Sequence, residues 1–369
     1  MTEADFIQKK HINKQKKGSI TWQSPSNIAL VKYWGKYGEQ LPANPSVSFT
    51  LSNSKTITEL KFELKNIPSD TFEFEVFFEG NKSEDFKPKI ETFFKRVEKY
   101  VPFLKEYQFE IHTSNTFPHS SGIASSASGM SALAICLVSL EKQMLASAPL
   151  SDQDQRSLSG FEVKKSSFLA RLGSGSACRS VEGDLVVWGE HSKIEGSSNL
   201  FGIKYPLKVH DNFKNYQDTI LLVDKGEKQV SSSVGHNLMH NHPFSEQRFQ
   251  QANDNLTKLI SVFESGNLSE FIKIVESEAL TLHAMMMASM PYFILMKPNT
   301  LEIINKIWTY RKETNSNICF TLDAGANVHI LYPENEKTSI LKFIKNELVV
   351  FCQNGQYICD QIGFGAKKV

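Results

Sequence analysis

The sequence predicts a mixed protein of helices and strands that is divided into two lobes. Its 369 residues can bury a substantial core, and this length favours two domains or lobes over one. The first third contains runs in which apolar and charged residues alternate, as in antiparallel strands with one solvent-facing side. Much of the second half carries apolar residues at helical spacing.

The composition excludes several classes of protein. Hydrophobic residues make up 40% of the chain and charged residues 22%, and the formal net charge of +1 gives no drive toward nucleic acid or membranes. The five cysteines are scattered without a CxxC pair, and no apolar run is long enough to cross a bilayer. We therefore expect a cytoplasmic protein that binds neither nucleic acid nor membranes.

The N-terminal third is expected to hold a basic tail followed by strands. Residues 1–18 carry five lysines and no apolar segment after them, which favours a solvated, partly frayed tail over a secretory signal. After the tail, runs of apolar or alternating residues predict strands and one helix. We expect the helix over residues 89–100 and strands over residues 28–31, 47–51, 60–64, 72–76 and 107–112.

Basic and aromatic side chains follow the first buried strand. The end of this strand or the loop after it holds Lys32, Tyr33 and Lys36. Two lysines and a tyrosine beside an apolar strand can form a clamp for an anion. The alternative is that both lysines only cover apolar surface with their aliphatic stems.

A stretch rich in small and hydroxyl side chains, residues 117–129, comes before an apolar helix that reaches about Leu140. The first N–H groups of a helix lack intrahelical partners and favour negative charge, so this helix start can bind phosphate. Ser125 or Ser126 could also offer a hydroxyl to a phosphate-bound magnesium ion. The alternative is a serine-rich N-cap on a buried helix, since the loop matches neither GxxxxGK[ST] nor GxGxxG.

A second loop of this kind, residues 173–180, follows a helix expected over residues 151–172 and capped by Ser151. A lone GSGS sequence is usually a flexible turn. Here Arg179 accompanies it, and the planar fork of arginine suits carboxylate or phosphate. The loop is therefore a candidate oxyanion site, and a strand is expected after it over residues 185–188.

The C-terminal half is expected to form a second lobe, with the boundary near residues 195–215. A third hydroxyl cluster lies in this half, before His236, His240 and His242. These histidines lack a cysteine or acidic partner at ligand spacing, so we expect packing or solvated histidines here and not a zinc site. Strands and helices follow from apolar spacing. We expect strands over residues 220–223, 318–322, 348–351 and 357–362, and helices around 256–263, 271–287, 301–308 and 337–346.

Asp323 comes directly after the strand at residues 318–322, in a loop of small residues. An acid in such a loop is well placed to face a cleft. Together with three hydroxyl-rich loops and several cations, it indicates an α/β enzyme that handles phosphates, with Asp323 as a candidate polar centre.

Four segments resemble the diphosphomevalonate decarboxylase family of the GHMP kinase superfamily: residues 27–36, 118–129, 173–180 and 323–327. They occur in the family's order, and the resemblance extends over nearly the whole chain. It implies an α+β, two-lobed GHMP kinase fold: after the tail, a ribosomal protein S5 domain 2-like N-terminal lobe (residues 19–205) with the phosphate-binding loop, and a C-terminal GHMP lobe (residues 206–369) with an antiparallel sheet and helices. A homodimer is typical of such enzymes.

The resemblance implies a reaction of isoprenoid biosynthesis in the mevalonate pathway. Mevalonate 5-diphosphate is phosphorylated by ATP on its 3-hydroxyl, and loss of phosphate and carbon dioxide gives isopentenyl diphosphate. The nearest alternatives are a decarboxylase of mevalonate 5-phosphate and a mevalonate 3-kinase. A more distant alternative is a non-catalytic protein that binds phosphometabolites.

The resemblance also implies roles for individual residues. Asp323, Lys32 and Arg179 are expected to be catalytic. For magnesium, the expected ligand is Ser125. Residues expected to bind ATP are Ser120, Ser121, Gly122, Ala124, Ser125 and Ser126. Residues expected to bind the substrate are Asn27, Tyr33, Trp34, Gly35, Lys36, Ser174, Gly175, Ser176, Ala177, Cys178, Arg179, Ser232 and Ser233.

Two positions depart from the family pattern. Many members have an arginine that grips the diphosphate where the nearest basic residues here are Lys87 and Lys89. Lysine binds phosphate as a point charge, without the bidentate fork. Ala326 replaces the usual proline of the motif after the strand. The acid Asp323 and the glycine Gly325 of this motif are both present.

Overall fold

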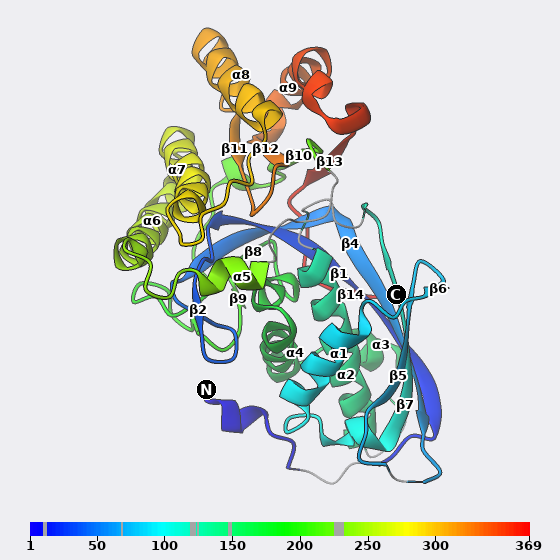
Figure 1. The fold of residues 1–369 in the computed structure, drawn as a ribbon. Helices are drawn as coiled ribbons and strands as arrows, with labels where there is room; N and C mark the ends of the chain where they lie inside the picture. Colours follow the sequence, from blue (N-terminus) through cyan, green and yellow to red (C-terminus); the bar gives the residue numbers. More distant parts are fainter. Residues whose placement is uncertain (10–12, 68, 119–122, 124, 147–149, 225–231) are drawn as a thin grey trace.

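The computed structural model describes residues 1–369 except 10–12, 68, 119–122, 124, 147–149 and 225–231. Within the described part, the strands form an eight-stranded sheet, a four-stranded sheet and a two-stranded hairpin. Helices pack against both larger sheets, and the two sheets belong to separate parts of the molecule (Figure 1). This arrangement is the α+β fold class that was predicted.

Two long antiparallel strands, β1 (Lys17–Val31) and β4 (Ser46–Leu64), form the centre of the first sheet. The sequence predicts strands 47–51 and 60–64 separately, but β4 runs through both without a break. The spatial order is β14-β1-β4-β7-β5-β6, and β8 pairs with β4 and β9. The other strands are β5 (Glu73–Phe78), β6 (Asn81–Lys82), β7 (Tyr107–Asn115), β8 (Leu185–Trp188), β9 (Ile203–Lys204) and β14 (Lys367–Lys368).

Three helices lie on one side of this sheet: α1 (Lys87–Val97), α2 (Ser125–Leu145) and α4 (Gly160–Gly173) (Figure 1). The prediction of one helix over residues 151–172 is wrong, because a short α3 (Asp152–Arg156) precedes α4. Ser151 caps α3, and Ser159 starts α4 with a capping box completed by Glu162. Two caps in this stretch satisfy two sets of helix-start N–H groups, so the helix is divided.

The N-terminal residues are more ordered than a solvated tail. Residues Glu3–Phe6 form a 3₁₀ turn, and the Phe6 side chain is fully buried. Its ring stacks on Phe168 of α4 at a centroid distance of 4.4 Å. The prediction of a frayed tail is therefore wrong for this turn, because burying an aromatic ring outweighs the cost of ordering a few residues.

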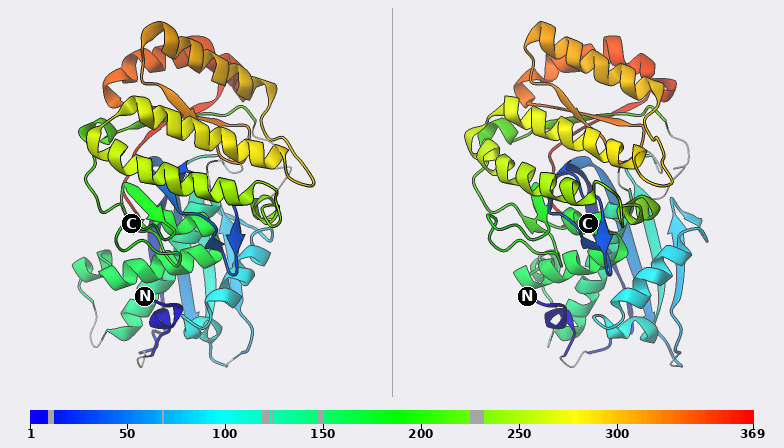
Figure 2. Two further views of the ribbon diagram at one scale, coloured as in Figure 1. Left: turned by 90° about the vertical axis from the view of Figure 1, so that its left-hand side faces the viewer. Right: turned by 60° about the vertical axis from the view of Figure 1, so that its left-hand side comes forward.

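The second sheet has the order β11-β12-β10-β13. Long helices α6 and α7 lie side by side in both views of Figure 2, beneath α8 and the sheet. The strands are β10 (Gln217–Leu221), β11 (Cys319–Thr321), β12 (Val328–Tyr332) and β13 (Tyr357–Gln361). The helices are α5 (Ser232–Asn237), α6 (Ser245–Ser265), α7 (Leu268–Met287), α8 (Pro298–Thr314) and α9 (Lys337–Phe343).

Two features of this part differ from the sequence prediction. The central strand β12 was not predicted, although its five residues are all buried. A strand was predicted over residues 348–351, but Val349–Phe351 form a 3₁₀ turn that continues the helical chain after α9. A short apolar run does not distinguish a strand from a buried turn of helix.

Asp360 of β13 joins the two sheets. Its carboxylate accepts hydrogen bonds from the backbone amides of Ser52, Asn53 and Ser54 in β4, at 2.7 to 2.9 Å. A mixed hydrophobic cluster crosses the same junction, with Phe49 of β4 close to Phe271 of α7. The ends of β1 and β4 are thereby held against the second part of the molecule.

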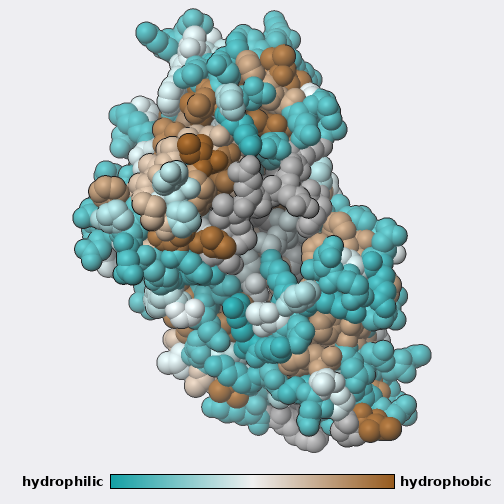
Figure 3. All heavy atoms as spheres, viewed as in Figure 1, coloured by the Kyte–Doolittle hydropathy of each residue, from teal (hydrophilic) through white to brown (hydrophobic). Residues whose placement is uncertain are grey.

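Hydrophobic side chains gather near the C-terminal end of α7 in Figure 3. In the segment that follows this helix, Met290 and Tyr292 are largely exposed. Hydrophilic side chains cover most of the rest of this face. Among the described helices, none has the length and hydropathy to cross a membrane.

Candidate active site

The site begins where β1 ends and Lys32 turns toward the second sheet. The ammonium Nζ of Lys32 lies 3.0 Å from Oδ1 of Asp323, in the connection between β11 and β12. Lys32 is 2% exposed and the Asp323 side chain 32%, so the carboxylate is the accessible partner. Burial lowers the pKa of Lys32, while the charge of Asp323 opposes that shift. The pair presents an acid whose ionised form is favoured by an adjacent cation.

Arg179 is the second buried cation near this acid. It lies in the 3₁₀ turn Gly175–Ser180, and its guanidinium donates to Oγ of Ser46 at 2.5 Å and to Oδ1 of Asn27 at 3.4 Å. The group also lies over the ring of Trp188, 5.6 Å from its centroid. Burial lowers the pKa of Arg179, and the charge of Asp323 opposes this shift. These contacts fix the plane of the guanidinium.

The turn after Lys32 packs against the turn that holds Arg179. The Tyr33 hydroxyl is buried without a hydrogen-bond partner in the described part of the chain, and burial raises the pKa of Tyr33. A Cβ at Gly175 would lie 2.8 Å from that hydroxyl oxygen, so a larger residue at this position would force the Tyr33 side chain to move. An unpartnered buried hydroxyl is a costly group unless a ligand binds it.

His236 of α5 supports the same turn from the other side. Its Nδ1 accepts the Gly35 amide hydrogen at 3.0 Å, and its ring lies 4.2 Å from that of Tyr33 and 4.7 Å from that of Trp34. Burial is the main cause that lowers the pKa of His236 to about 3, so the imidazole is neutral at pH 7. His242 is also buried, whereas His240 is exposed.

Lys36 begins the β2–β3 hairpin (Lys36–Tyr37 with Leu41–Pro42). Its ammonium donates to Oε1 of Gln40 at 3.2 Å. Burial lowers the pKa of Lys36, and the neighbouring charge of Arg96 lowers it further. Two cations that repel each other in a partly buried place favour binding of an anion.

The start of α2 meets the Arg179 turn. Oγ of Ser126 lies 3.4 Å from Oγ of Ser174, so two of the three hydroxyl-rich segments lie side by side. The helix start is fixed from the sheet, because Ser26 Oγ donates to the carbonyl of Ile123 and Thr56 Oγ1 lies 2.6 Å from Oγ of Ser128.

For some of the predicted site residues, the structure describes no side-chain position. Ser120, Ser121, Gly122 and Ala124 lie outside the described residues. The backbone of Ser232 and Ser233 starts α5, but their side chains also lie outside the described part.

The rest of the Arg179 turn faces inward. The side chains of Ala177 and Cys178 are buried, and burial raises the pKa of the Cys178 thiol to about 12, which keeps it protonated. The backbone carbonyl of Ser176 accepts a hydrogen bond from the Asn27 amide at 3.2 Å. The buried side chains of Ala177 and Cys178 therefore support the turn, and the Ser176 carbonyl holds the Asn27 side chain in place.

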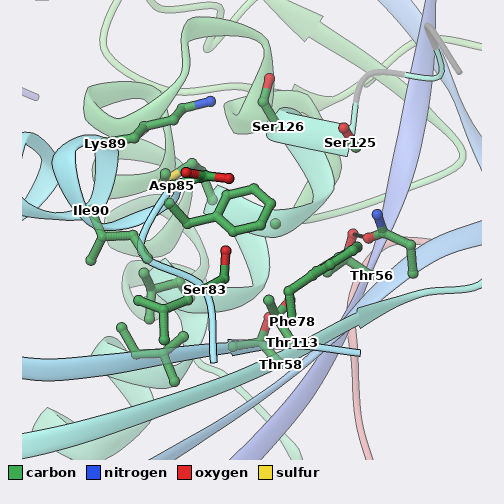
Figure 4. Close-up of a pocket in the computed structure, with 17 residues that line it drawn as sticks. Thr56, Thr58, Phe78, Ser83, Asp85, Lys89, Ile90, Thr113, Ser125 and Ser126 are labelled. Carbon is green, nitrogen blue, oxygen red and sulfur yellow. Dashed lines mark hydrogen bonds between the residues drawn. The ribbon is translucent and has the colours of Figure 1, made fainter. Parts of the chain in front are cut away.

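A cavity of about 610 Å³ opens between α1, the start of α2 and the first sheet (Figure 4). Ser125 and Ser126 lie at one end, and Lys89 projects from α1 toward Ser126. Its walls are mostly apolar, with a few polar groups such as Thr58 and Asp85. A largely apolar cavity that ends at a helix N-terminus suits a flat ring linked to an anion.

Several residues that contact this site were not predicted from the sequence, among them Ser46, Glu278 and His283. Glu278 had a recognisable signal, since it lies seven positions after Phe271 and four before Leu282, on the apolar face of its helix. A charge on an apolar face indicates a buried partner. Ser46 had no comparable signal, because its role depends on the pairing of β4 with β8.

This chain is similar to several known proteins along most of its length. A family model described as the diphosphomevalonate decarboxylase-like N-terminal domain matches residues 24–199. A model described as the mevalonate 5-diphosphate decarboxylase C-terminal domain matches residues 219–363. The diphosphomevalonate decarboxylase of Ganoderma lucidum is 27% identical over 368 residues, which covers 95% of this chain and 86% of the relative.

Solved structures of decarboxylases are also similar to this chain. The crystal structure of mevalonate diphosphate decarboxylase from Staphylococcus aureus matches with a TM-score of 0.77 and 26% identity, covering 96% of this chain and 98% of that one. A structure of MDDEF in complex with MVAPP, AMPPCP and magnesium has a TM-score of 0.78 and 25% identity, covering 96% and 99%. Since the two family models together match most of the chain and these relatives align along nearly all of it, the protein belongs to the diphosphomevalonate decarboxylase family.

Proposed function

We propose that the protein catalyses the ATP-dependent decarboxylation of mevalonate 5-diphosphate, yielding isopentenyl diphosphate, ADP, phosphate and carbon dioxide. The observation that carries the proposal is the Lys32–Asp323 ion pair, whose carboxylate also interacts with the charge of Arg179. An ionised acid, a lysine that favours its charge and an arginine that can bind a carboxylate are the groups that this reaction requires. The family membership and the MVAPP complex of a relative support the choice of substrate.

In the first step the 3-hydroxyl oxygen attacks the terminal phosphorus of ATP and ADP leaves. Asp323 orients that hydroxyl and accepts its proton, for which it must be ionised. Lys32 favours the ionised carboxylate and is itself held by burial on all sides. A phosphoryl transfer needs positioning and electrostatic stabilisation more than covalent help from the protein.

In the second step the new phosphate leaves with the electrons of its C–O bond. The electrons of the bond to the carboxyl carbon form the double bond, and carbon dioxide departs. Arg179 binds the substrate carboxylate and holds it in line with the leaving phosphate. Its side chain is fixed by Asn27, Ser46 and Trp188, which limits the geometries that the carboxylate can adopt.

The remaining polar groups bind the rest of the substrate. The Tyr33 hydroxyl and the Lys36 ammonium bind the diphosphate, together with Ser174 and Ser176 of the Arg179 turn. Ser232 and Ser233 complete this set from α5. The unpartnered Tyr33 hydroxyl and the two neighbouring cations Lys36 and Arg96 support an anion here.

ATP binds at the start of α2, with its base and ribose in the cavity of Figure 4. Ser125 and Ser126 lie where the cavity meets the helix start, which places hydroxyl and N–H groups beside the phosphates. Hydroxyl oxygens suit magnesium, and Ser125 would hold this ion with the nucleotide, where it neutralises phosphate charge. A relative that holds AMPPCP, an ATP analogue, together with magnesium supports this assignment.

The alternative to mevalonate 5-diphosphate is a substrate with one phosphate fewer. Lys89 lines the nucleotide cavity, and Lys87 pairs with Glu84 at 2.9 Å, so neither offers the bidentate grip of an arginine. These observations keep mevalonate 5-phosphate as the second candidate substrate.

A coupled assay tests the function. Purified protein with Mg-ATP is given mevalonate, its 5-phosphate or its 5-diphosphate, and ADP and carbon dioxide are followed together. We expect the diphosphate to give the highest kcat/KM, with ADP and carbon dioxide in equal amounts. Higher kcat/KM for the monophosphate would overturn the substrate, ADP without carbon dioxide would indicate a 3-kinase, and binding without turnover would indicate a binding protein.

We also propose a cytoplasmic homodimer, on the family resemblance alone. Light scattering after gel filtration measures the mass in solution. A mass of one chain would contradict the dimer.

A further inference from the structure

Helix α7 contacts the backbone of both partners in the Lys32–Asp323 ion pair. Oε2 of Glu278 accepts the backbone amide hydrogen of Lys32 at 2.8 Å. Nε2 of His283, five residues further along the same helix, lies 3.1 Å from the backbone carbonyl oxygen of Asp323. We infer that Glu278 and His283 are positioning residues that set the distance and direction between the Lys32 and Asp323 side chains. This inference rests on the proposed function.

The Glu278 side chain is held rigidly, because both oxygens of its carboxylate accept hydrogen bonds. It is completely buried, it pairs with Arg248 of α6, and its Oε1 also accepts from Asn255 at 2.6 Å. The carbonyl oxygen of Lys32 is held as well, by the Asn44 side-chain amide at 2.9 Å. Both backbone polar groups of Lys32 are therefore fixed, so its side chain leaves from a defined point.

The His283 anchor holds the other partner. The ring is 1% exposed, and burial lowers the pKa of His283 to about 4, so it is neutral at pH 7. A carbonyl oxygen only accepts hydrogen bonds, so Nε2 carries the hydrogen and donates it. The same oxygen accepts the Gly325 amide hydrogen at 2.7 Å. Asp323 therefore starts from a carbonyl that is held by the helix and by its own turn.

The two anchors matter because Lys32 and Asp323 come from separate parts of the chain. Lys32 follows a strand of the first sheet, and Asp323 follows a strand of the second. A helix is a stiff element, so two side chains on α7 fix one backbone relative to the other. A displacement of about 1 Å in a catalytic group can cost about 100-fold in rate. Loss of either anchor should thus lower kcat although neither residue touches the substrate.

The same helix contains a matched control. Glu276 is also buried and pairs with an arginine, Arg311 of α8, at 2.6 Å. It also accepts from Trp308 Nε1 at 3.0 Å. Within the described part of the chain, the hydrogen-bond partners of Glu276 are Trp308 and Arg311 of α8, so removing its charge weakens an ion pair that involves neither Lys32 nor Asp323. A purely structural role of Glu278 predicts the same result for both glutamates.

The experiment compares Glu278→Gln, His283→Ala and His283→Gln with Glu276→Gln. We expect the first two to lower kcat at least about tenfold, with KM for ATP and substrate nearly unchanged, by loss of orientation alone. His283→Gln should recover most of kcat, because its amide can donate to the same carbonyl. Glu276→Gln should lower the melting temperature without lowering kcat. If Glu278→Gln does not fold, the double variant Glu278→Met/Arg248→Met replaces the buried pair by apolar groups and takes its place.

A second measurement does not depend on turnover. Carbon NMR follows the titration of the Asp323 carboxylate, whose signal is assigned by comparison with Asp323→Asn. Among the described residues, the titratable or charged groups that interact with this carboxylate include Lys32, Arg179, Asp218 and His283. We expect a higher midpoint in Glu278→Gln and His283→Ala than in wild type and Glu276→Gln, because Lys32 no longer lies at its place. Unchanged midpoints with wild-type kcat would overturn the inference. A wild-type protein without turnover would contradict the proposed function, and the midpoints would still decide this inference.

Discussion

Lys32 and Asp323 form an ion pair of 3.0 Å although 291 positions separate them in the chain. Lys32 is buried, while about a third of the Asp323 side chain is accessible. A buried cation thus lies beside a partly accessible carboxylate, and the proposed function needs such a carboxylate to accept the proton of a bound alcohol.

Asp323→Asn tests this acid. The amide cannot accept the proton of the 3-hydroxyl, so we expect carbon dioxide release to fall by about three orders of magnitude, within the range of general-base catalysis. ATP and substrate affinity, measured by calorimetry, should stay within a few-fold of wild type. Asp211→Asn is the control, since Asp211 is largely exposed and distant in sequence. Near-normal turnover of Asp323→Asn would show that another group takes the proton.

Arg179→Lys tests the carboxylate contact. An ammonium cannot reproduce the planar fork, and it also loses the contacts to Ser46 and Asn27. We expect a fall in kcat of about 100-fold through lost orientation, and more ADP than carbon dioxide, because the second step depends on the carboxylate more than the first. Ser46→Ala removes one support only and should have a smaller effect. Equal amounts of both products at a wild-type rate would contradict this role.

Much of the fold and of the site follows from local sequence patterns. The buried strand before Lys32, the helix that reaches about Leu140 and the strand before Asp323 were predicted from runs of apolar residues and are present as β1, α2 and β11. Each of these patterns lies within a few neighbouring positions, so it can be recognised in the sequence. The roles of the site residues remain predictions.

What the sequence did not predict depends on long-range pairing. Strand β12 is central because β10 and β11 pair with it on its two sides, and this pairing is not visible in its five residues. Ser46 reaches Arg179 only after β4 pairs with β8. Residues that are far apart in the chain meet here through the fold, so no local pattern indicates them.

The buried neutral histidines predict a stability that depends on pH. The pKa of His236 is lowered to about 3 and that of His283 to about 4, from an ordinary value of 6.5. Below 6.5 the unfolded chain takes up these protons and the folded protein does not, so stability is full above 6.5 and falls as pH decreases. Each histidine should add up to about 1.4 kcal/mol per pH unit to this loss.

Urea unfolding from pH 7 to pH 4.5 measures this dependence. In His283→Gln the slope should be smaller by about one proton, because glutamine does not titrate. His240→Gln is the control, since His240 is exposed. A slope that is equal in wild type and His283→Gln would show that His283 titrates alike in both states.

Phe6→Ala tests the N-terminal turn. The Phe6 ring is fully buried among Phe161, Phe168 and Phe201, so its removal leaves a cavity in the first core. We expect a loss of about 3 kcal/mol in the free energy of unfolding, as for other buried phenylalanines. Ile7→Ala is the matched control, because Ile7 is 39% exposed and should cost less than about 1 kcal/mol. Equal losses in the two variants, measured by urea unfolding, would mean that the turn contributes nothing specific. Since Phe6 packs on α4, whose C-terminal end leads into the Arg179 turn, the Phe6→Ala protein should also lose activity at lower temperatures than wild type.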